Sequence, residues 1–297
     1  MNFYNLHIIN DFILKKYELL SLNEIKNKKN FLLIKKKICI INEKQSLRTI
    51  NTLINFLNFF NIKFTIINNK HNFKKENIKD FSRTLGILYD YVFFRSYNDI
   101  IIKLIAKFSG SVLVNMLSNN YHPIQSINDI FLLYNNCVYF FGDFNSNVFK
   151  SIIVNLTKIN KYKTIIFFSP KKYWNYIFLK KIFNTKKIIL SEKIIFLNKN
   201  VIIYNDVWFS MGENYFKKKI NNLINFQINK KIFKILKIKK IFHCLPSYKK
   251  KKKYSEIEEC IFESNYIFFD KQIIDKIIFL KSYFFISNKV FFNYYYY

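Results

Sequence analysis

Short apolar runs alternate with amphipathic segments along the first half of the chain, and this alternation constrains the fold most. Runs with the length and composition of buried strands are Lys37–Asn42, Ile62–Ile67, Val92–Arg95 and Val112–Asn115. The segments between them space their apolar residues as one face of a helix does, as at Ile50, Leu53, Ile54 and Leu57. Further helices are predicted over residues 2–30, 75–88 and 100–108. Repeated strand–helix–strand units predict a parallel sheet covered by helices.

The second half repeats the pattern after a helix predicted from Pro123 to about Asn135. The apolar runs there are Cys137–Gly142, Thr164–Ser169, Ile188–Ser191, Val201–Asp206 and Lys240–Leu245. A helix begins near Phe149, and more helix is predicted from Ile261 to about Lys289. We therefore predict an α/β chain with two doubly wound parallel-sheet domains, the first ending near residue 134.

Polar residues follow the predicted strands of the first half. They are Ser46, Arg48, Arg95, Asn115 and His122. In a parallel sheet the carboxyl ends of the strands lie at one edge, so these side chains are expected to converge. Ser46 is a natural N-cap, which leaves the first amides of its helix and Arg48 facing an anion. Two arginines, a histidine and a capped helix start predict a phosphate-bearing ligand, although capping alone would explain Ser46.

His122 precedes Pro123, and this pair predicts a strand-to-helix junction. A residue before proline is held out of helical geometry, whereas proline suits the first helical position. Gln125 and Asp129 lie four residues apart on one face of the helix. A ligand site and an ordinary surface histidine are both compatible with this motif taken alone.

Net charge is ambiguous evidence about partners. The formal charge is +30, but the lysines are spread along the chain and no nucleic-acid-binding motif is present. A basic surface would serve a small anionic substrate or a polyanion equally well. A composition of 51% hydrophobic and 20% aromatic residues argues against a disordered chain.

The cysteines indicate a reducing compartment and no metal site. Cys39, Cys137, Cys244 and Cys260 form no CxxC pair and lack histidines at metal-ligand spacing. No signal peptide and no long apolar run is apparent, so we expect a cytoplasmic protein that does not bind metal or membrane.

Several separated motifs together resemble one family, the ornithine carbamoyltransferases of the aspartate/ornithine transcarbamylase superfamily. Ser46-Leu47-Arg48-Thr49 is similar to the family's Ser-Thr-Arg-Thr loop, and Arg95, Asn115 and His122-Pro123-Ile124-Gln125 match further positions. On the amino-acid side the matching motifs are Asn147, the segment Asp206–Gly212, and His243-Cys244-Leu245-Pro246. The last two are typical of the ornithine branch.

The resemblance implies transfer of a carbamoyl group from carbamoyl phosphate to the δ-amine of L-ornithine, without metal or cofactor, in arginine biosynthesis. The implied carbamoyl phosphate site comprises Ser46, Leu47, Arg48, Thr49, Lys75, Arg95, His122, Gln125, Cys244 and Leu245. The implied ornithine site comprises Asn147, Asp206, Ser210 and Met211. The residues closest to the reaction would be Arg95, His122, Gln125, Asp206 and Cys244.

The resemblance also implies an assembly and a domain plan. It implies a homotrimer with shared sites, in which Lys75 reaches a neighbouring subunit's phosphate and a solvated helix-start lysine is the alternative. The expected carbamoyl phosphate domain is residues 1–134, joined by a C-terminal helix of about 272–292, and the ornithine domain is 135–271. No nucleic acid and no membrane is expected as a partner.

The sequence departs from the family at four places. Leu47 replaces a threonine, Ile50 replaces an arginine, His71 aligns with a glutamine, and the arginine expected near Phe284 is missing. Because loss of a buried charged donor weakens transition-state binding, a weakened homologue is one alternative. A transferase for aspartate, putrescine or an acylornithine is another, and a basic nucleic-acid-binding protein is a third.

Overall fold

The structure is a computed structural model, and it describes most of the chain between residues 36 and 284. The described residues are 36–43, 46–68, 76–133, 136–156, 164–175, 179, 188–195, 200–209, 213, 217–247, 255–277, 279–280 and 284. The helix predicted at residues 2–30 lies outside them. The chain divides into two compact units, residues 1–128 with 273–297 and residues 129–272.

Unit 1 is built on a parallel sheet of four strands. In chain order they are β1 (Ile38–Asn42), β2 (Phe64–Ile67), β3 (Tyr91–Arg95) and β4 (Val112–Leu117). The spatial order is β2-β1-β3-β4, and all neighbouring strands are parallel. The chain therefore turns to opposite sides of β1, which makes the gap between β1 and β3 the switch point of this sheet.

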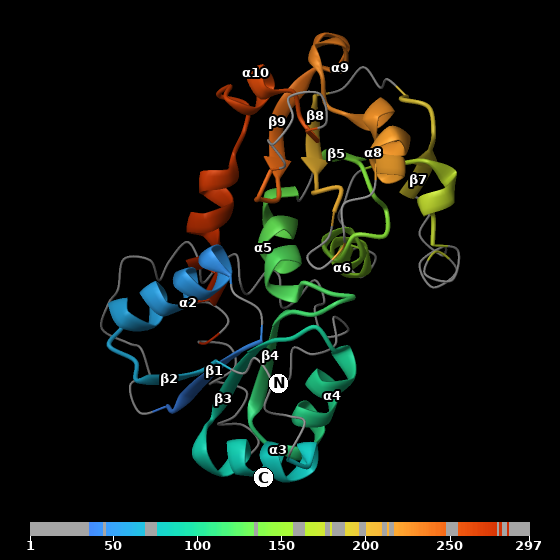
Figure 1. The fold of residues 1–297 in the computed structure, drawn as a ribbon. Helices are drawn as coiled ribbons and strands as arrows, with labels where there is room; N and C mark the ends of the chain where they lie inside the picture. The colour runs from blue at the N-terminus through green and yellow to red at the C-terminus, as the bar shows by residue number, and fades with distance from the viewer. Residues whose placement is uncertain are drawn as a thin grey trace. The chain divides into compact units, whose positions relative to one another are not determined.

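Helices cover both faces of the first sheet (Figure 1). One face packs on α3 (Ile78–Leu88) and α4 (Asp99–Phe108), through Leu85, Ile102 and Ile105. The other face packs on α2 (Leu47–Phe59) and on Phe284. The Phe284 ring stacks on Phe56 of α2 at a centroid distance of 5.5 Å. The predicted doubly wound sheet and the return of the C-terminal segment to unit 1 are confirmed.

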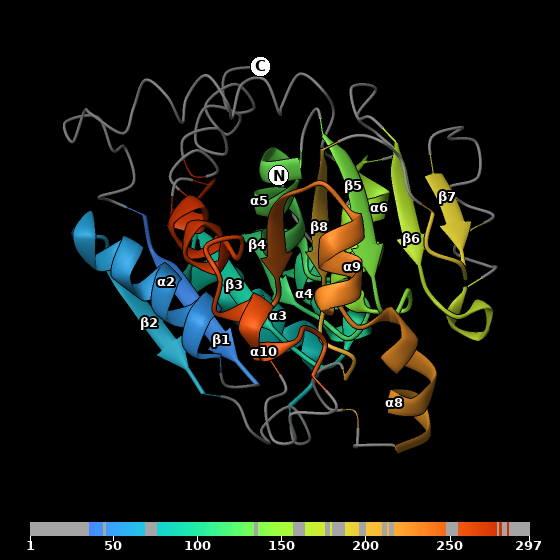
Figure 2. The same ribbon diagram turned by 90° about the horizontal axis from the view of Figure 1, so that it is seen from above.

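Unit 2 is built on a parallel sheet of five strands. They are β5 (Cys137–Phe141), β6 (Ile165–Phe168), β7 (Ile188–Ser191), β8 (Val201–Asn205) and β9 (Ile238–His243). Figure 2 shows them side by side in the order β7-β6-β5-β8-β9. The order reverses at β5, so the switch point of this sheet lies between β5 and β8.

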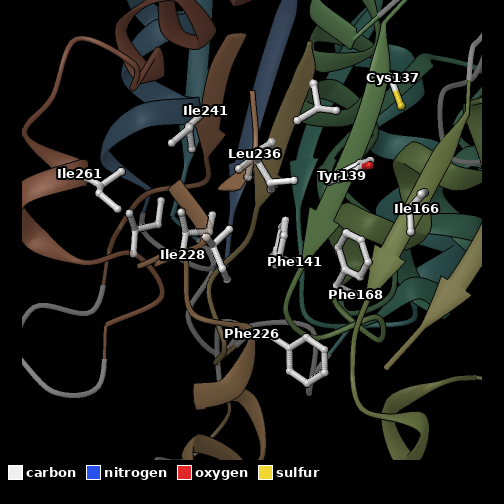
Figure 3. Close-up of a cluster of buried hydrophobic side chains, with 14 of the residues drawn as sticks. Cys137, Tyr139, Phe141, Ile166, Phe168, Phe226, Ile228, Leu236, Ile241 and Ile261 are labelled. Carbon is white, nitrogen blue, oxygen red and sulfur yellow. The ribbon is translucent and has the colours of Figure 1, made fainter. Parts of the chain in front are cut away.

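The central strands of the second sheet, β5, β6 and β8, are also buried on both faces. The helical elements of unit 2 with described bounds are, after α5, α6 (Asn147–Leu156), η4 (Lys171–Tyr173), α8 (Lys217–Leu223), η5 (Ile224–Phe226), α9 (Lys230–Ile235) and α10 (Glu259–Phe262). On one face, the apolar cluster of Figure 3 joins Tyr139 and Phe168 to Phe226, Leu236 and Ile261. On the other, Phe140 stacks on Phe167 at 4.4 Å and meets Phe149 of α6 edge-on.

Helix α5 (Pro123–Leu133) carries the division between the units, which falls after Asn128. The sequence placed this boundary after the helix, near residue 134. Pro123 is the first residue of α5, as predicted. Within the described part of the chain, no helix is long and apolar enough to cross a membrane.

Several element boundaries differ from the prediction by a few residues, and two of these differences have a clear local cause. Strand β9 begins at Ile238, and α6 begins at Asn147 instead of near Phe149. The first half of β9 is only partly buried, so its lysines do not end the strand. Helix α6 begins earlier because the Phe149 amide donates to Ser146 Oγ at 3.0 Å, which makes Ser146 a cap.

Candidate functional site

The first group of predicted residues surrounds the start of α2, directly after β1. Ser46 is extended, and its Oγ accepts a hydrogen bond from the Thr49 amide at 3.2 Å. Thr49 is buried, whereas Leu47 is 76% exposed. The predicted N-cap is confirmed. The backbone of a helix does not satisfy the amides of its own first turn, and such amides attract anions.

Arg95 ends β3 on the other side of the switch point. Its side chain is 1% exposed, and it pairs in register with Asn42 at the end of β1. Burial lowers the pKa of Arg95 to about 10. The charge of Arg48 also lowers this pKa, whereas Tyr97 raises it. The two guanidinium groups are thus close enough to repel each other. An anion placed between them would relieve that repulsion.

His122 lies immediately before α5 and is 7% exposed. Burial lowers its pKa well below 6.5, and the charges of Lys276, Arg95 and Arg48 lower it further, in that order. The structure therefore brings the predicted Arg48, Arg95 and His122 into one electrostatic cluster. At neutral pH the imidazole is uncharged, so it offers one N–H donor and one acceptor nitrogen.

Lys276 is a member of this cluster that the sequence did not single out. It lies in a helical segment, residues 269–277, and is 5% exposed. Phe284, near which an arginine was expected, instead has its ring fully buried against Phe56, Tyr91 and Phe93. Among the described residues of the C-terminal segment, Lys276 is thus a cation that acts on His122.

Two carboxamides complete the described part of this group. Gln125 is 6% exposed in the first turn of α5. Asn115, in β4, is 1% exposed and donates from Nδ2 to Ser118 Oγ at 3.2 Å. Its Oδ1 has no hydrogen-bond partner among the described residues. Lys75 and His71 lie outside the described residues.

The second group lies at the switch point of unit 2. Asp206 follows β8, is 2% exposed, and accepts from the Val207 amide at 2.9 Å. Burial raises the pKa of Asp206 to about 6, with a smaller contribution from Asp143. Hydrogen bonds from Ser146, Val207 and Cys244 oppose the shift. The carboxylate is therefore ionised at neutral pH and held by fixed donors.

Cys244 follows β9 and reaches the same place. Its amide donates to the Asn205 carbonyl at 3.2 Å, and its Sγ lies 3.1 Å from the Tyr204 hydroxyl. Leu245 comes next, before a cis peptide bond to Pro246. The structure thus brings the predicted Asp206 and Cys244 together, with Tyr204 and Ser146 as members that the sequence did not identify.

Asn147 is the first residue of α6 and is half-buried. Ser210 and Met211 lie outside the described residues. The nearby Lys219 ammonium forms ion pairs with Asp143 at 2.6 Å and Glu213 at 2.9 Å. Among the described residues, no group of three or more histidine, cysteine or acidic side chains could hold a metal ion.

Comparisons with known proteins agree across both units. Residues 10–135 match the family described as aspartate/ornithine carbamoyltransferase, carbamoyl-P binding domain, and residues 135–281 match its Asp/Orn binding domain. An ornithine carbamoyltransferase of Buchnera aphidicola subsp. Schizaphis graminum is 33% identical over 241 residues, 73% of this chain and 70% of that protein. Another, from Buchnera aphidicola subsp. Baizongia pistaciae, is 32% identical over 268 residues, 82% and 76% of the two chains.

Solved structures resemble the fold as well. The anabolic ornithine carbamoyltransferase of Campylobacter jejuni superposes with a TM-score of 0.80 at 25% identity, over 97% of this chain and 99% of that one. The enzyme of Pyrococcus furiosus gives a TM-score of 0.79 at 22% identity, over 95% of each chain.

Proposed function

Since the chain belongs to the aspartate/ornithine carbamoyltransferase family, we propose that it moves the carbamoyl group of carbamoyl phosphate to the δ-amine of L-ornithine. The products are L-citrulline and phosphate, and the reaction uses no cofactor. The observation that carries the proposal is the cluster of the buried Arg95, His122 and Lys276 with the partly buried Arg48, beside the capped start of α2. Such a cluster suits a doubly charged phosphate ligand.

Each residue of this cluster has a proposed role. The α2 amides, with Ser46, Leu47, Arg48 and Thr49, hold the phosphate. Arg95 and His122, with the Thr49 hydroxyl, donate toward the carbamoyl oxygen, which gains negative charge as the tetrahedral intermediate forms. A neutral His122 fits this role because it donates one hydrogen bond without adding a further buried charge. Gln125 and the Leu245 carbonyl orient the carbamoyl nitrogen.

The second group is proposed to hold the amino acid. Asp206 is ionised at neutral pH, which suits the α-ammonium of ornithine, with Asn147, Ser210 and Met211 on the α-carboxylate side. Cys244 lies beside the attacking δ-amine, which reacts only after it loses its proton. Acceleration then comes mainly from positioning and from stabilisation of the developing charge.

The acceptor amine and the direction of the reaction are further parts of the proposal. A relative from Mycoplasma capricolum subsp. capripneumoniae, 33% identical over 195 residues, is named a catabolic ornithine carbamoyltransferase. We infer the citrulline-forming direction, arginine biosynthesis and a cytoplasmic homotrimer with shared sites. Assays with ornithine, aspartate, putrescine and an acylornithine, in both directions, test the acceptor and the direction.

The decisive experiment compares variants of the purified chain at two buried site residues and at one exposed arginine. Arg95→Ala and His122→Ala are expected to lower citrulline formation by at least about tenfold, because each removes a buried donor to the reacting oxygen. Arg83→Ala is the matched control, since Arg83 is exposed and pairs only weakly with Asp80 at the surface. Equal activity in all three variants would remove the site assignment. Salt-dependent nucleic-acid binding without any transfer would favour the binding-protein alternative.

A further inference from the structure

Tyr204 carries a hydrogen-bond arrangement that the proposed roles do not use. Its side chain is fully buried in β8, with the ring 5.3 Å from Phe140 and 5.9 Å from Phe149. Its hydroxyl contacts two groups, a carboxylate oxygen of Asp129 and Sγ of Cys244, the latter at 3.1 Å. Packing therefore fixes the ring, and the ring fixes where the hydroxyl lies.

The hydroxyl has only one proton to share between these two contacts. A carboxylate accepts hydrogen bonds and donates none, so the phenolic proton points to Asp129, which is itself fully buried. Burial and the charge of Asp129 raise the pKa of Tyr204 well above 10, so the phenol keeps this proton. Toward Cys244 the hydroxyl then presents only an oxygen lone pair.

A lone pair facing the sulfur favours one form of Cys244. A thiol can donate its proton to the Tyr204 oxygen or to Asp206, whereas a thiolate would face electron-rich oxygens from both. Among the described residues, Tyr204 and Asp206 contact the sulfur from the β8 side, and Asp129 of α5 contacts the Tyr204 hydroxyl. The charge of Asp143 acts on Asp206, and His243, the last residue of β9, precedes Cys244 in the chain. The oxygens among them are acceptors or carry negative charge.

We propose that Tyr204 is a positioning residue for Cys244: fixed as an acceptor by Asp129, its hydroxyl keeps Cys244 a neutral thiol with a set orientation. The consequence of this arrangement for the reaction rests on the proposed function. A neutral Cys244 would present sulfur lone pairs, and no negative charge, to the δ-amine of ornithine. The inference concerns the Asp129–Tyr204–Cys244 chain in unit 2 and needs no substrate to be tested.

The test is the pH dependence of Cys244 alkylation by iodoacetamide, since only the thiolate reacts. It uses the full chain with Cys260→Ser, because Cys260 is exposed while Cys39 and Cys137 are buried, and mass spectrometry identifies the alkylated peptide. In the Cys260→Ser chain, the pH midpoint of Cys244 alkylation is expected above the ordinary thiol pKa of about 8.5. Asp129→Asn is expected to lower it by about one pH unit, which makes alkylation about tenfold faster at pH 7.

A double-mutant cycle separates the proposed chain from direct repulsion by Asp129. In the Tyr204→Phe background, Asp129→Asn should move the midpoint far less, because the hydroxyl that transmits its effect is gone. An equal shift in both backgrounds, or no shift from Asp129→Asn, overturns the proposal. Tyr139→Phe, in the buried core of the same sheet, is the matched control and should leave the midpoint unchanged.

Folding is checked by thermal melting of every variant. Tyr204→Phe removes a hydrogen-bond donor from the buried Asp129 carboxylate, which disfavours folding. If this variant fails the folding check, the Asp129→Asn chain alone tests the proposal, and an unchanged alkylation midpoint overturns it. Alkylation is measured without ornithine or carbamoyl phosphate. A chain that makes no citrulline would therefore refute the proposed function while leaving this result readable.

Discussion

At the residue scale, burial and like charge act on His122 in the same direction. The imidazole lies in the interior of unit 1, and Lys276, Arg95 and Arg48 all disfavour its protonation. Carboxylates near a histidine would instead raise its pKa. The cluster therefore keeps His122 neutral at physiological pH, which fits its proposed role as a hydrogen-bond donor that adds no further buried positive charge.

This arrangement predicts that His122 makes a pH-dependent contribution to the free energy of unfolding. The folded-state pKa lies below 6.5, so in the interval beneath pH 6.5 the unfolded chain binds more protons than the folded chain. The contribution is full above pH 6.5 and declines as the pH falls. Between pH 7.5 and 5.5, the free energy of unfolding measured in urea should fall by about 1 kcal/mol more in the wild type than in His122→Asn. Parallel losses in the two chains would contradict the assigned environment.

Lys276 is predicted to act as part of the anion site. Lys276→Gln should lower kcat/KM for carbamoyl phosphate by at least about tenfold, because a buried cation beside His122 is lost. Lys276→Arg keeps the charge and should retain most activity. Lys271→Gln is the control, since Lys271 is exposed on the same helical segment. A tenfold loss in the control as well would show that the assay responds to general charge.

At the element scale, the cap of α2 has both a structural and a ligand-binding part. Ser46→Ala should destabilise the chain by about 1 kcal/mol and also raise KM for carbamoyl phosphate, because the first turn would lose its fixed geometry. Asn77→Ala is the matched control, since Asn77 caps α3 by accepting from the Lys79 amide at 2.9 Å. It should cost similar stability with KM unchanged. Denaturant unfolding and steady-state kinetics measure the two effects, and a raised KM in both variants would mean that the Ser46 effect is only structural.

Central strands were predictable from the sequence because both of their faces are buried. Tyr91–Arg95 and Cys137–Phe141 are buried at every position, so each appears as an apolar run, which Arg95 ends in the first. The edge strand β9 was less predictable, because only its last three residues are fully buried and its lysines resemble a loop.

The site was predictable where a backbone signal marked a residue, and not where only tertiary contacts do. A cap marks Ser46 and a proline marks His122, whereas Lys276 is one of 49 basic residues and is set apart only by burial. Helical spacing placed Asp129 on a face of α5. Its partner Tyr204, however, lies 75 residues further along the chain, and no local pattern reveals that contact.

At the scale of the whole molecule, each unit places its polar residues at the switch point of its own sheet. In unit 1 the start of α2 follows β1 and Arg95 ends β3, and these two strands are neighbours. In unit 2 Ser146 follows β5 and Asp206 follows β8, again on neighbouring strands. Adjacent loops at a switch point lead to opposite faces of the sheet and leave a crevice between them. The same topological rule thus accounts for both groups.

The proposed shared sites of a homotrimer make a prediction about mixed assemblies. Lys75→Gln and Arg95→Ala chains should each be inactive, because each site would take Lys75 from one subunit and Arg95 from its neighbour. In an equal mixture, refolded together, a site is intact when its Arg95 comes from the Lys75→Gln chain and its Lys75 from the Arg95→Ala chain. Random assembly gives this for about a quarter of the sites, and citrulline formation should recover accordingly. Light scattering should give three times the 36.2 kDa of one chain. A mixed trimer without recovery would place each site within a single subunit.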